Sequence, residues 1–275
     1  MEKTLELPAM PFIATRVIRA VDDPKTTGNV LAAIIETDPG ITAWVMRVTN
    51  SAAYGRQRKV TSLPQAVTLL GFNELKNLVI SASVRALYRT FGPIEKELWL
   101  HSVAAGIASR MIAQEAARTM AAKSLREAAF LAGQMHDVGR LIIRNKMPQE
   151  YTQIAECGPE MGLIQAEESV LGYAHTDVGS LIMQRWNMPN VIEAAAFYHH
   201  DLEMCEMLAA EHASLVSCVV LADELAHRQG IGGPPNPNDN TSVPRALELL
   251  GINDTRFDAL SQPFADAFAA ERAAG

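Results

Sequence analysis

Eight side chains in this sequence are candidates to bind metal ions, because of their types and their spacing. They are His101, His136, His175, His199 and His200, with the carboxylates Glu97, Asp137 and Asp223. Imidazole and carboxylate together suit divalent ions such as iron or manganese. His136 and Asp137 are adjacent, and neighbouring side chains on a helix diverge by ~100°. The pair can therefore coordinate one ion together or bridge two ions. An ordinary polar pair on a solvated face is the alternative.

Asp223 strengthens the metal interpretation because of what precedes it. The apolar run from Leu215 to Ala222 must be largely buried, and Asp223 follows it directly. An ionised carboxylate in such a helix is costly unless it is paired or coordinates a metal ion. Pairing with an arginine, or capping of a neighbouring helix, is the alternative.

Two further candidates have weaker individual signals. Glu97 lies four residues before His101, so a helix would place both on one face. A simple side-chain contact between them is the alternative to shared ligation. His175 stands near a predicted helix start, where a lone histidine more often has a capping or surface role.

The remaining histidines divide into one pair and two single residues. His199 and His200 are adjacent, so one ring can be buried while the other faces solvent. His212 and His227 are predicted at the surface. His227 nevertheless follows Asp223 by four residues, a spacing from which it can support that carboxylate.

The elements that must position these side chains are helices. Apolar residues recur at helical spacing and strand-like alternation is scarce, so the predicted fold class is all-α. A proline in the first turn predicts a helix boundary at Asp38-Pro39. Glycine and asparagine predict matching helix corners at Leu69–Asn73 and Leu249–Asn253. Further helices are predicted over residues 73–88, 123–145 with an interruption near Gly139, 161–172, 175–186, 189–199, 208–228 and 257–272.

The organisation is that of two helical lobes. We place a boundary near residue 92, between an N-terminal helical lobe (residues 1–92) and a lobe with the metal-site candidates and the C-terminal helices (residues 93–275). The stretch 230–244 is rich in Gly, Pro and Asn and is predicted to be a loop.

Bulk properties exclude several classes of partner. The formal net charge is −7, and a protein that neutralises many phosphates would be basic, so nucleic acid is not expected as a partner. The three cysteines show no C-x-x-C spacing, which suits reduced thiols in the cytoplasm. No secretory signal and no run of ~20 apolar residues is present, so we expect a soluble cytoplasmic protein that does not enter a membrane.

The order of the candidate ligands resembles a known superfamily. The series His101, His136-Asp137, His175, His199-His200, Asp223 is similar to the HD superfamily of metal-dependent phosphohydrolases, as is Gly-x-x-His-Asp-x-Gly-Arg at residues 133–140. Several N-terminal motifs resemble the HDOD domain, and the likeness covers roughly residues 5–210. They are Leu7-Pro8, Asp38-Pro39-Gly40, Arg47–Ala52 and Ala66–Gly71.

The resemblance implies a multi-helix HD-type bundle and a bacterial signal-transduction or regulatory module. HDOD proteins often have degenerate HD ligands, whereas this sequence retains a full set. We therefore expect a regulatory module with a mono- or dinuclear metal site of iron or manganese. Signalling proteins would bind its N-terminal lobe, and a phosphate-containing ligand is a further candidate.

A metal-dependent phosphohydrolase or phosphodiesterase is the main alternative. The resemblance then implies a first ion held by His101, His136, Asp137 and Asp223. Asp137 would bridge to a second ion held by His175, His199 or His200, with Glu97 as a further ligand. Asp137 and Arg140 would be the catalytic residues, with Arg140 steadying a phosphate oxygen.

Two departures from the HD pattern argue against hydrolysis of cyclic di-GMP. No Gly-Tyr-Pro follows His199-His200, and Arg140 stands where many HD hydrolases have lysine. A third hypothesis is an oxygen-using di-iron enzyme, because the same ligand mixture suits iron.

Overall fold

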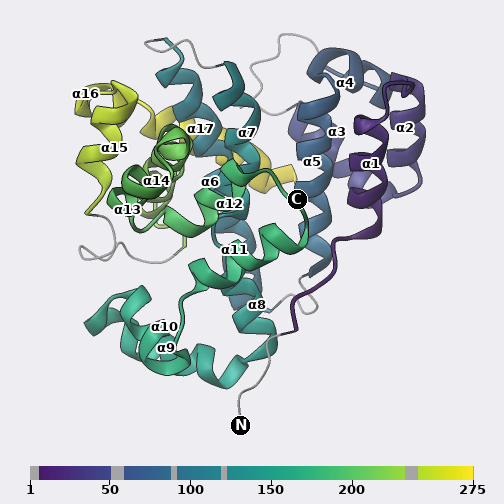
Figure 1. The fold of residues 1–275 in the computed structure, drawn as a ribbon. Coiled ribbons are helices and arrows are strands. Elements are labelled where there is room, and N and C mark those ends of the chain that lie inside the picture. Colours follow the sequence, from purple (N-terminus) through teal and green to yellow (C-terminus); the bar gives the residue numbers. More distant parts are fainter. Residues whose placement is uncertain (1–5, 51–58, 88–91, 119–122, 233–240, 275) are drawn as a thin grey trace. The chain divides into compact units, whose positions relative to one another are not determined.

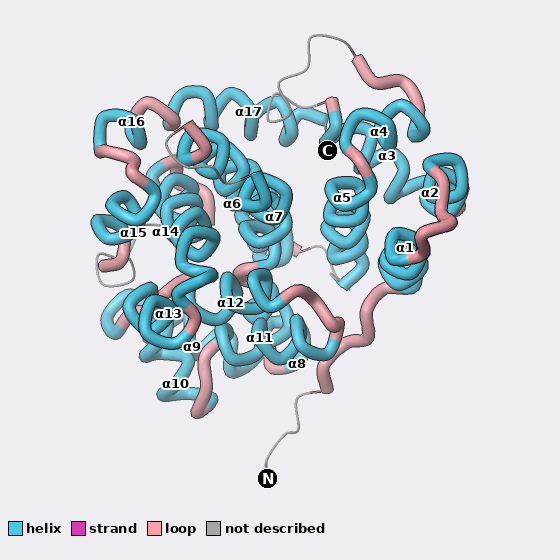
Figure 2. Tube along the Cα trace, turned by 45° about the horizontal axis from the view of Figure 1, so that its top comes forward, coloured by secondary structure: helices cyan, strands magenta, loops and turns pink. Residues whose placement is uncertain are grey.

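The computed structural model describes residues 6–50, 59–87, 92–118, 123–232 and 241–274, and every regular element in these ranges is a helix (Figures 1 and 2). The all-α prediction is confirmed. By their internal contacts the residues form two compact units. One contains residues 10–87 and 262–275, and the other contains residues 1–9 and 88–261. Residues 262–275 thus group with residues 10–87, whereas the sequence-based division placed them in the second lobe.

The unit that contains residues 10–87 is a small helical bundle. Its helices pack around fully buried aliphatic side chains such as Leu31, Ile35 and Leu75. The predicted boundary at Asp38 is confirmed, because its carboxylate accepts a hydrogen bond from the Ile41 amide (3.0 Å) and caps the next helix. The elements are α1 (Phe12–Asp22), α2 (Gly28–Glu36), α3 (Pro39–Thr49), α4 (Leu63–Leu70), α5 (Phe72–Val84), the 3-10 helix η2 (Arg85–Leu87) and α17 (Ser261–Ala274).

The unit that contains residues 88–261 is built around one long helix. This helix, α6 (Pro93–Ala116), packs against α7 (Lys123–Met135) and α14 (Ala213–Arg228). The other elements are α8 (Val138–Lys146), α9 (Pro148–Met161), α10 (Leu163–Leu171), α11 (His175–Arg185), α12 (Asn190–Tyr198), α13 (Leu202–Leu208), the 3-10 helix η3 (Ala210–His212), α15 (Val243–Leu250) and α16 (Asp254–Asp258). Among the described helices, none combines the length and the apolar character that a bilayer crossing requires.

Several helix boundaries differ from the prediction. The predicted interruption near Gly139 lies earlier, between α7 and α8, so that it contains His136 and Asp137. Helix α9 was not predicted, because Pro159 stands inside it and Ile154 is its buried residue. Of the two predicted corners, Asn253 does cap α16.

The other corner is built differently, because α5 begins at Phe72 and Asn73 lies inside it. Gly71 makes the turn with φ +79°, a backbone conformation that glycine adopts without strain. The predicted loop over residues 230–244 lies partly outside the described residues. Helix α15 begins at its end, at Val243.

Candidate metal centre

The His136-Asp137 pair lies at the buried junction between α7 and α8. Glycines let neighbouring helices approach this junction closely. A Cβ atom on Gly133 would collide with the Ala105 carbonyl of α6, and one on Gly139 would collide with the His175 carbonyl of α11. The two glycines of the Gly-x-x-His-Asp-x-Gly stretch therefore allow four helices, α6, α7, α8 and α11, to converge on one cluster of side chains.

The orientation of the buried imidazoles is fixed by acceptors on their Nδ1 atoms. His136 Nδ1 donates to the Gly133 carbonyl at 2.6 Å, and His199 Nδ1 donates to the Ala195 and Ala196 carbonyls at 3.2 and 3.1 Å. A carbonyl oxygen can only accept, so in the neutral rings the proton is on Nδ1 and the Nε2 lone pair is available. This arrangement is typical of histidines that bind metal ions.

His175 and His101 have similar support from other groups. His175 Nδ1 and its backbone amide both donate to Glu167 Oε2, at 2.7 and 2.8 Å. His101 Nδ1 lies 3.4 Å from the Ile231 carbonyl. Next to it, a Cβ atom on Gly232 would collide with the His101 ring, so the chain after α14 closes tightly over this histidine.

The Nε2 atoms of these rings face one another across the cluster. The Nε2 atoms of His101 and His136 are 3.4 Å apart, and those of His175 and His199 are 3.3 Å apart. Two lone pairs at this distance repel unless a proton or a cation lies between them. Two nitrogen ligands with bonds of ~2.0–2.1 Å to one ion would lie about 3–3.4 Å apart. The ring spacing thus fits shared coordination.

Two buried carboxylates complete the cluster. Asp137 Oδ1 lies 3.1 Å from His175 Nε2, and its Oδ2 lies 3.6 Å from His101 Nε2. Asp223 Oδ1 lies 3.2 Å from His101 Nε2 and 3.7 Å from His136 Nε2. Asp137 therefore contacts both pairs of histidines, whereas Asp223 contacts one pair.

Among the residues that the structure describes, three overlapping groups of side chains could each hold a metal ion, because the ligand atoms within each group lie within 4.8 Å of one another. Because Asp137 belongs to two of the groups and His101 to two, the arrangement has room for one or two ions. The groups are Asp137 with His175, His199 and His200; His101 with His136 and Asp137; and His101 with Asp223 and His227.

The electrostatics of the cluster favour positive charge next to the carboxylates. Burial alone would lower the pKa of His175, but Glu167 and Asp137 outweigh it and raise that pKa to about 10. Burial would raise the pKa of Asp137, yet Arg140 and the histidines hold it well below its usual range. Burial lowers the pKa of His199 to about 4, with help from the neighbouring histidines. The cluster thus keeps both ionised carboxylates and a neutral imidazole ligand.

Arg140 lies beside the cluster on α8. Its Nη1 donates to Asp137 Oδ2 at 2.7 Å. Its buried Nε has no hydrogen-bond acceptor among the described residues. A cation of this kind neutralises Asp137 and presents a second donor next to the candidate metal ligands.

The structure brings together every predicted metal residue except Glu97. Glu97 is exposed and belongs to none of the three groups. Four residues advance a helix by about 6 Å, which is enough to carry Glu97 beyond the cluster. In the same turn Glu95 is the buried carboxylate, and it pairs with Arg144 at 3.0 Å.

Two side chains at the cluster were not among the predicted ligands. His227 was predicted at the surface, with its four-residue spacing from Asp223 noted as a means of supporting that carboxylate. In the structure its ring stacks on that of His101 and its Nδ1 lies 3.5 Å from Asp223 Oδ2. Glu167 had no comparable signal, because its contact with His175 depends on how α10 and α11 fold together.

The described residues thus form an all-helical scaffold with a histidine–aspartate cluster at a helix junction, as the resemblance to the HD superfamily implied. The HDOD domain family model matches residues 7–202 of this chain. The chain therefore belongs to the HDOD domain family.

Solved structures share this fold over nearly the whole chain. An HDOD domain protein of unknown function from Geobacter sulfurreducens is 26% identical, with a TM-score of 0.75, and the match covers 96% of this chain and 92% of that one. A Shewanella amazonensis protein, whose name assigns it provisionally to the metal-dependent phosphohydrolases, is 22% identical with a TM-score of 0.71. That match covers 98% of this chain and 92% of the other.

A curated relative is an uncharacterized protein from Treponema pallidum. It is 22% identical over 227 residues, which is 79% of this chain and 42% of the relative. This chain thus spans less than half the length of that relative.

Proposed function

We propose that this HDOD protein is a signal-transduction module whose helical core binds one or two divalent metal ions. The observation that carries the proposal is the convergence of four imidazoles, with their Nδ1 atoms already engaged, on two buried carboxylates. Such a cluster is electrostatically unfavourable without cations and suits iron or manganese.

The geometry suggests which residues would hold each ion. One position would use His101, His136, Asp137 and Asp223. A second would use His175, His199 and His200, with Asp137 shared. Asp137 would contribute to both positions, and Arg140, which donates to its Oδ2, would help to keep this carboxylate ionised.

A regulatory role is supported by the burial of the cluster, since the side chains of His101, His136 and His199 are at most 2% exposed. A catalytic site keeps a position open for water, and burial limits the access of water and substrate to these ligands. Exposed apolar side chains in the N-terminal lobe support docking of signalling proteins there. They are Phe12, Val30 and Leu69.

A metal-dependent phosphohydrolase is the second candidate, and Arg140 is the observation that favours it. Its buried Nε donor is positioned for an anion next to the candidate ligands, and guanidinium binds phosphate oxygens well. In this function Arg140 would orient a phosphate ester and Asp137 would hold the ions. When bound, a divalent ion makes water a better nucleophile and neutralises charge on the phosphate.

Metal analysis of the purified protein tests the binding proposal. The protein should be prepared without a polyhistidine tag from medium containing Fe, Mn and Zn, and its metals measured by mass spectrometry. We expect at least one ion per chain, and its loss in Asp137→Ala and His199→Ala. His212→Ala removes a histidine outside the cluster and should retain full occupancy. Equal metal content in all four proteins would refute the site.

Activity assays separate the two functions. The metal-loaded protein should be tested on bis(p-nitrophenyl) phosphate and on cyclic dinucleotides, with Asp137→Ala as the control. No turnover with any bound metal supports the regulatory module. Turnover that disappears in Asp137→Ala would establish the hydrolase instead.

A further inference from the structure

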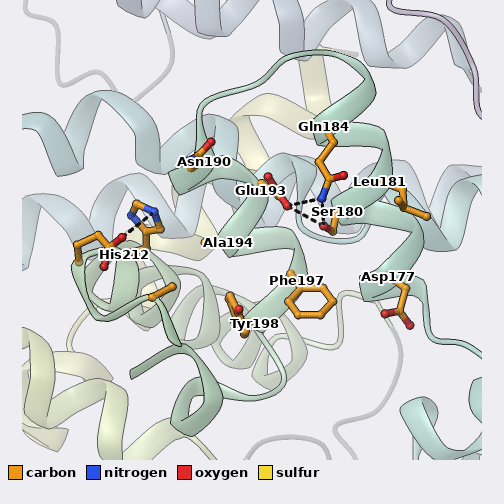
Figure 3. A pocket seen from close by; sticks show the side chains of 12 residues that line it. Asp177, Ser180, Leu181, Gln184, Asn190, Glu193, Ala194, Phe197, Tyr198 and His212 are labelled. Carbon is orange, nitrogen blue, oxygen red and sulfur yellow. Dashed lines mark hydrogen bonds and ion pairs between the residues drawn. The ribbon is translucent and has the colours of Figure 1, made fainter. Parts of the chain in front are cut away.

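A groove of about 570 Å³ lies on a surface separate from the metal cluster. It is formed by α11, α12 and the segment that follows α13, and Figure 3 shows the side chains that line it. The lining combines carboxylates with aromatic and aliphatic side chains, which include Asp177, Leu181, Glu193, Phe197, Tyr198 and Glu211.

The groove is acidic, and its sequence surroundings lack basic residues. No Lys or Arg occurs between Arg185 and Arg228, whereas this interval contains seven Asp or Glu residues. Glu193 is held in place because its Oε1 accepts hydrogen bonds from Gln184 (2.7 Å) and Ser180 (3.0 Å), as drawn in Figure 3. The groove therefore presents oriented negative charge that a cationic partner would neutralise.

Apolar side chains next to the groove are unusually exposed. Leu181 on α11 is 50% exposed, and Met207 and Leu208 at the end of α13 are 76% and 69% exposed. Leu208 directly precedes Ala209, which lines the groove. Single exposed hydrophobic residues are common, but a group of them beside a groove is typical of an interaction site. Methionine adapts its shape readily to a partner surface.

We propose that this groove and the adjacent end of α13 bind a basic amphipathic helix of a partner protein. The apolar stripe of such a helix would cover Leu181, Met207 and Leu208, while its Lys or Arg side chains would approach Glu193 and Glu211. Helices bind grooves in this way through apolar anchors at helical spacing, with charges at the rim.

The negative charge of the groove argues against three other binding partners. Nucleic acid and anionic lipid headgroups would be repelled by the carboxylates. A second copy of this chain would bring the same acidic face against itself in a two-fold dimer. A basic helix is the occupant that satisfies both the apolar and the acidic parts of the surface.

A designed probe tests the proposal on the full chain as purified. The probe is a fluorescein-labelled Leu–Lys peptide of about four helical turns, with its leucines on one face. Binding is followed by fluorescence anisotropy at low salt and at about 1 M NaCl, where charge attraction is screened. We expect saturable binding that weakens with salt. Because none of the residues that line the groove belongs to the metal cluster, the outcome is independent of the proposed metal centre.

Matched variants locate the binding site. Met207→Ser combined with Glu211→Lys should weaken probe binding by about tenfold, because both positions are exposed. Met161→Ser combined with Glu160→Lys makes the same chemical changes at exposed positions of α9, which lines no part of the groove, and should leave binding unchanged. Thermal melting confirms that both variants are folded.

Three results would overturn the proposal. One is no binding of the probe, and another is equal binding of a peptide in which the leucines are scattered around the helix. The third is weakening by the Met161 and Glu160 changes but not by those at Met207 and Glu211. Sedimentation of the unbound protein adds a check, since self-association abolished by the Met207 and Glu211 changes would identify a second copy as the occupant.

Discussion

Among side chains that are not themselves candidate ligands, Glu167 is the one whose removal should weaken metal binding most clearly. Its Oε2 accepts hydrogen bonds from the Nδ1 atom and the backbone amide of His175, at 2.7 and 2.8 Å. Glu167→Ala removes the acceptor of both hydrogen bonds. The His175 ring then loses the contact that directs its Nε2 atom at Asp137 and His199.

The expected loss of metal affinity can be estimated from these contacts. A hydrogen bond to a charged group contributes about 1.5–3 kcal/mol, and removal of a partner that orients a metal-binding histidine lowers metal affinity by roughly 10–100-fold. We therefore expect Glu167→Ala to weaken Mn²⁺ binding by ~1.4–2.8 kcal/mol. Glu167→Gln keeps one oxygen acceptor and should lie between the wild type and the alanine variant.

Competition between the protein and a fluorescent chelator for Mn²⁺ measures this affinity. Glu168→Ala is the matched control, because Glu168 is the next residue on α10 and is exposed. Its affinity should equal that of the wild type. If Glu167→Ala also binds Mn²⁺ within about twofold of the wild type while remaining folded, the assigned role of Glu167 in orienting His175 is wrong.

Three further predictions concern stability. Gly139→Ala should lower the free energy of unfolding by about 1–3 kcal/mol, because its Cβ would collide with the His175 carbonyl, whereas Gly158→Ala in open space should raise it by up to ~1 kcal/mol. Chelation should lower the melting temperature, and excess Mn²⁺ at about 100 times Kd should restore ~2.7 kcal/mol. Burial raises the pKa of Glu271 despite its ion pair with Arg47. The free energy of unfolding of Glu271→Gln should therefore increase relative to that of the wild type as pH rises from about 4 to 7.

The sign of the last effect follows from proton binding. Because the pKa of Glu271 is higher in the folded state, this group favours folding at low pH and loses that contribution as pH rises through the folded pKa. Glutamine has no such dependence. Chemical denaturation of both proteins across this range measures the difference, and parallel curves would contradict it. Likewise, a stable Gly139→Ala or a melting temperature insensitive to chelation would count against the packing and metal arguments.

The sequence was informative wherever one local interaction decides the structure. The Asp38-Pro39 boundary and the Asn253 cap follow from hydrogen bonds within a few residues, and the structure has both. The buried position of Asp223 followed from the apolar run before it. Helix α9 escaped prediction because helix packing, rather than an apolar stripe, supports an element whose buried residue is Ile154.

Parts of the candidate site needed the tertiary structure. Spacing alone put Glu97 on the face of His101, but it could not show where the cluster ends along α6, and Glu97 is exposed. The contact of Glu167 with His175 spans the turn between two helices. The sequence did indicate that His227 lies close to Asp223, because it follows that residue by one helical turn. Only the fold shows that its ring stacks on His101.

An anomalous-difference map from crystals of this protein grown with Mn²⁺ is the most direct test of the metal centre. We expect one or two peaks within bonding distance of Asp137, with His136 or His175 Nε2 in the same coordination shell. A map with Mn²⁺ peaks elsewhere on the protein and none between these side chains would contradict it.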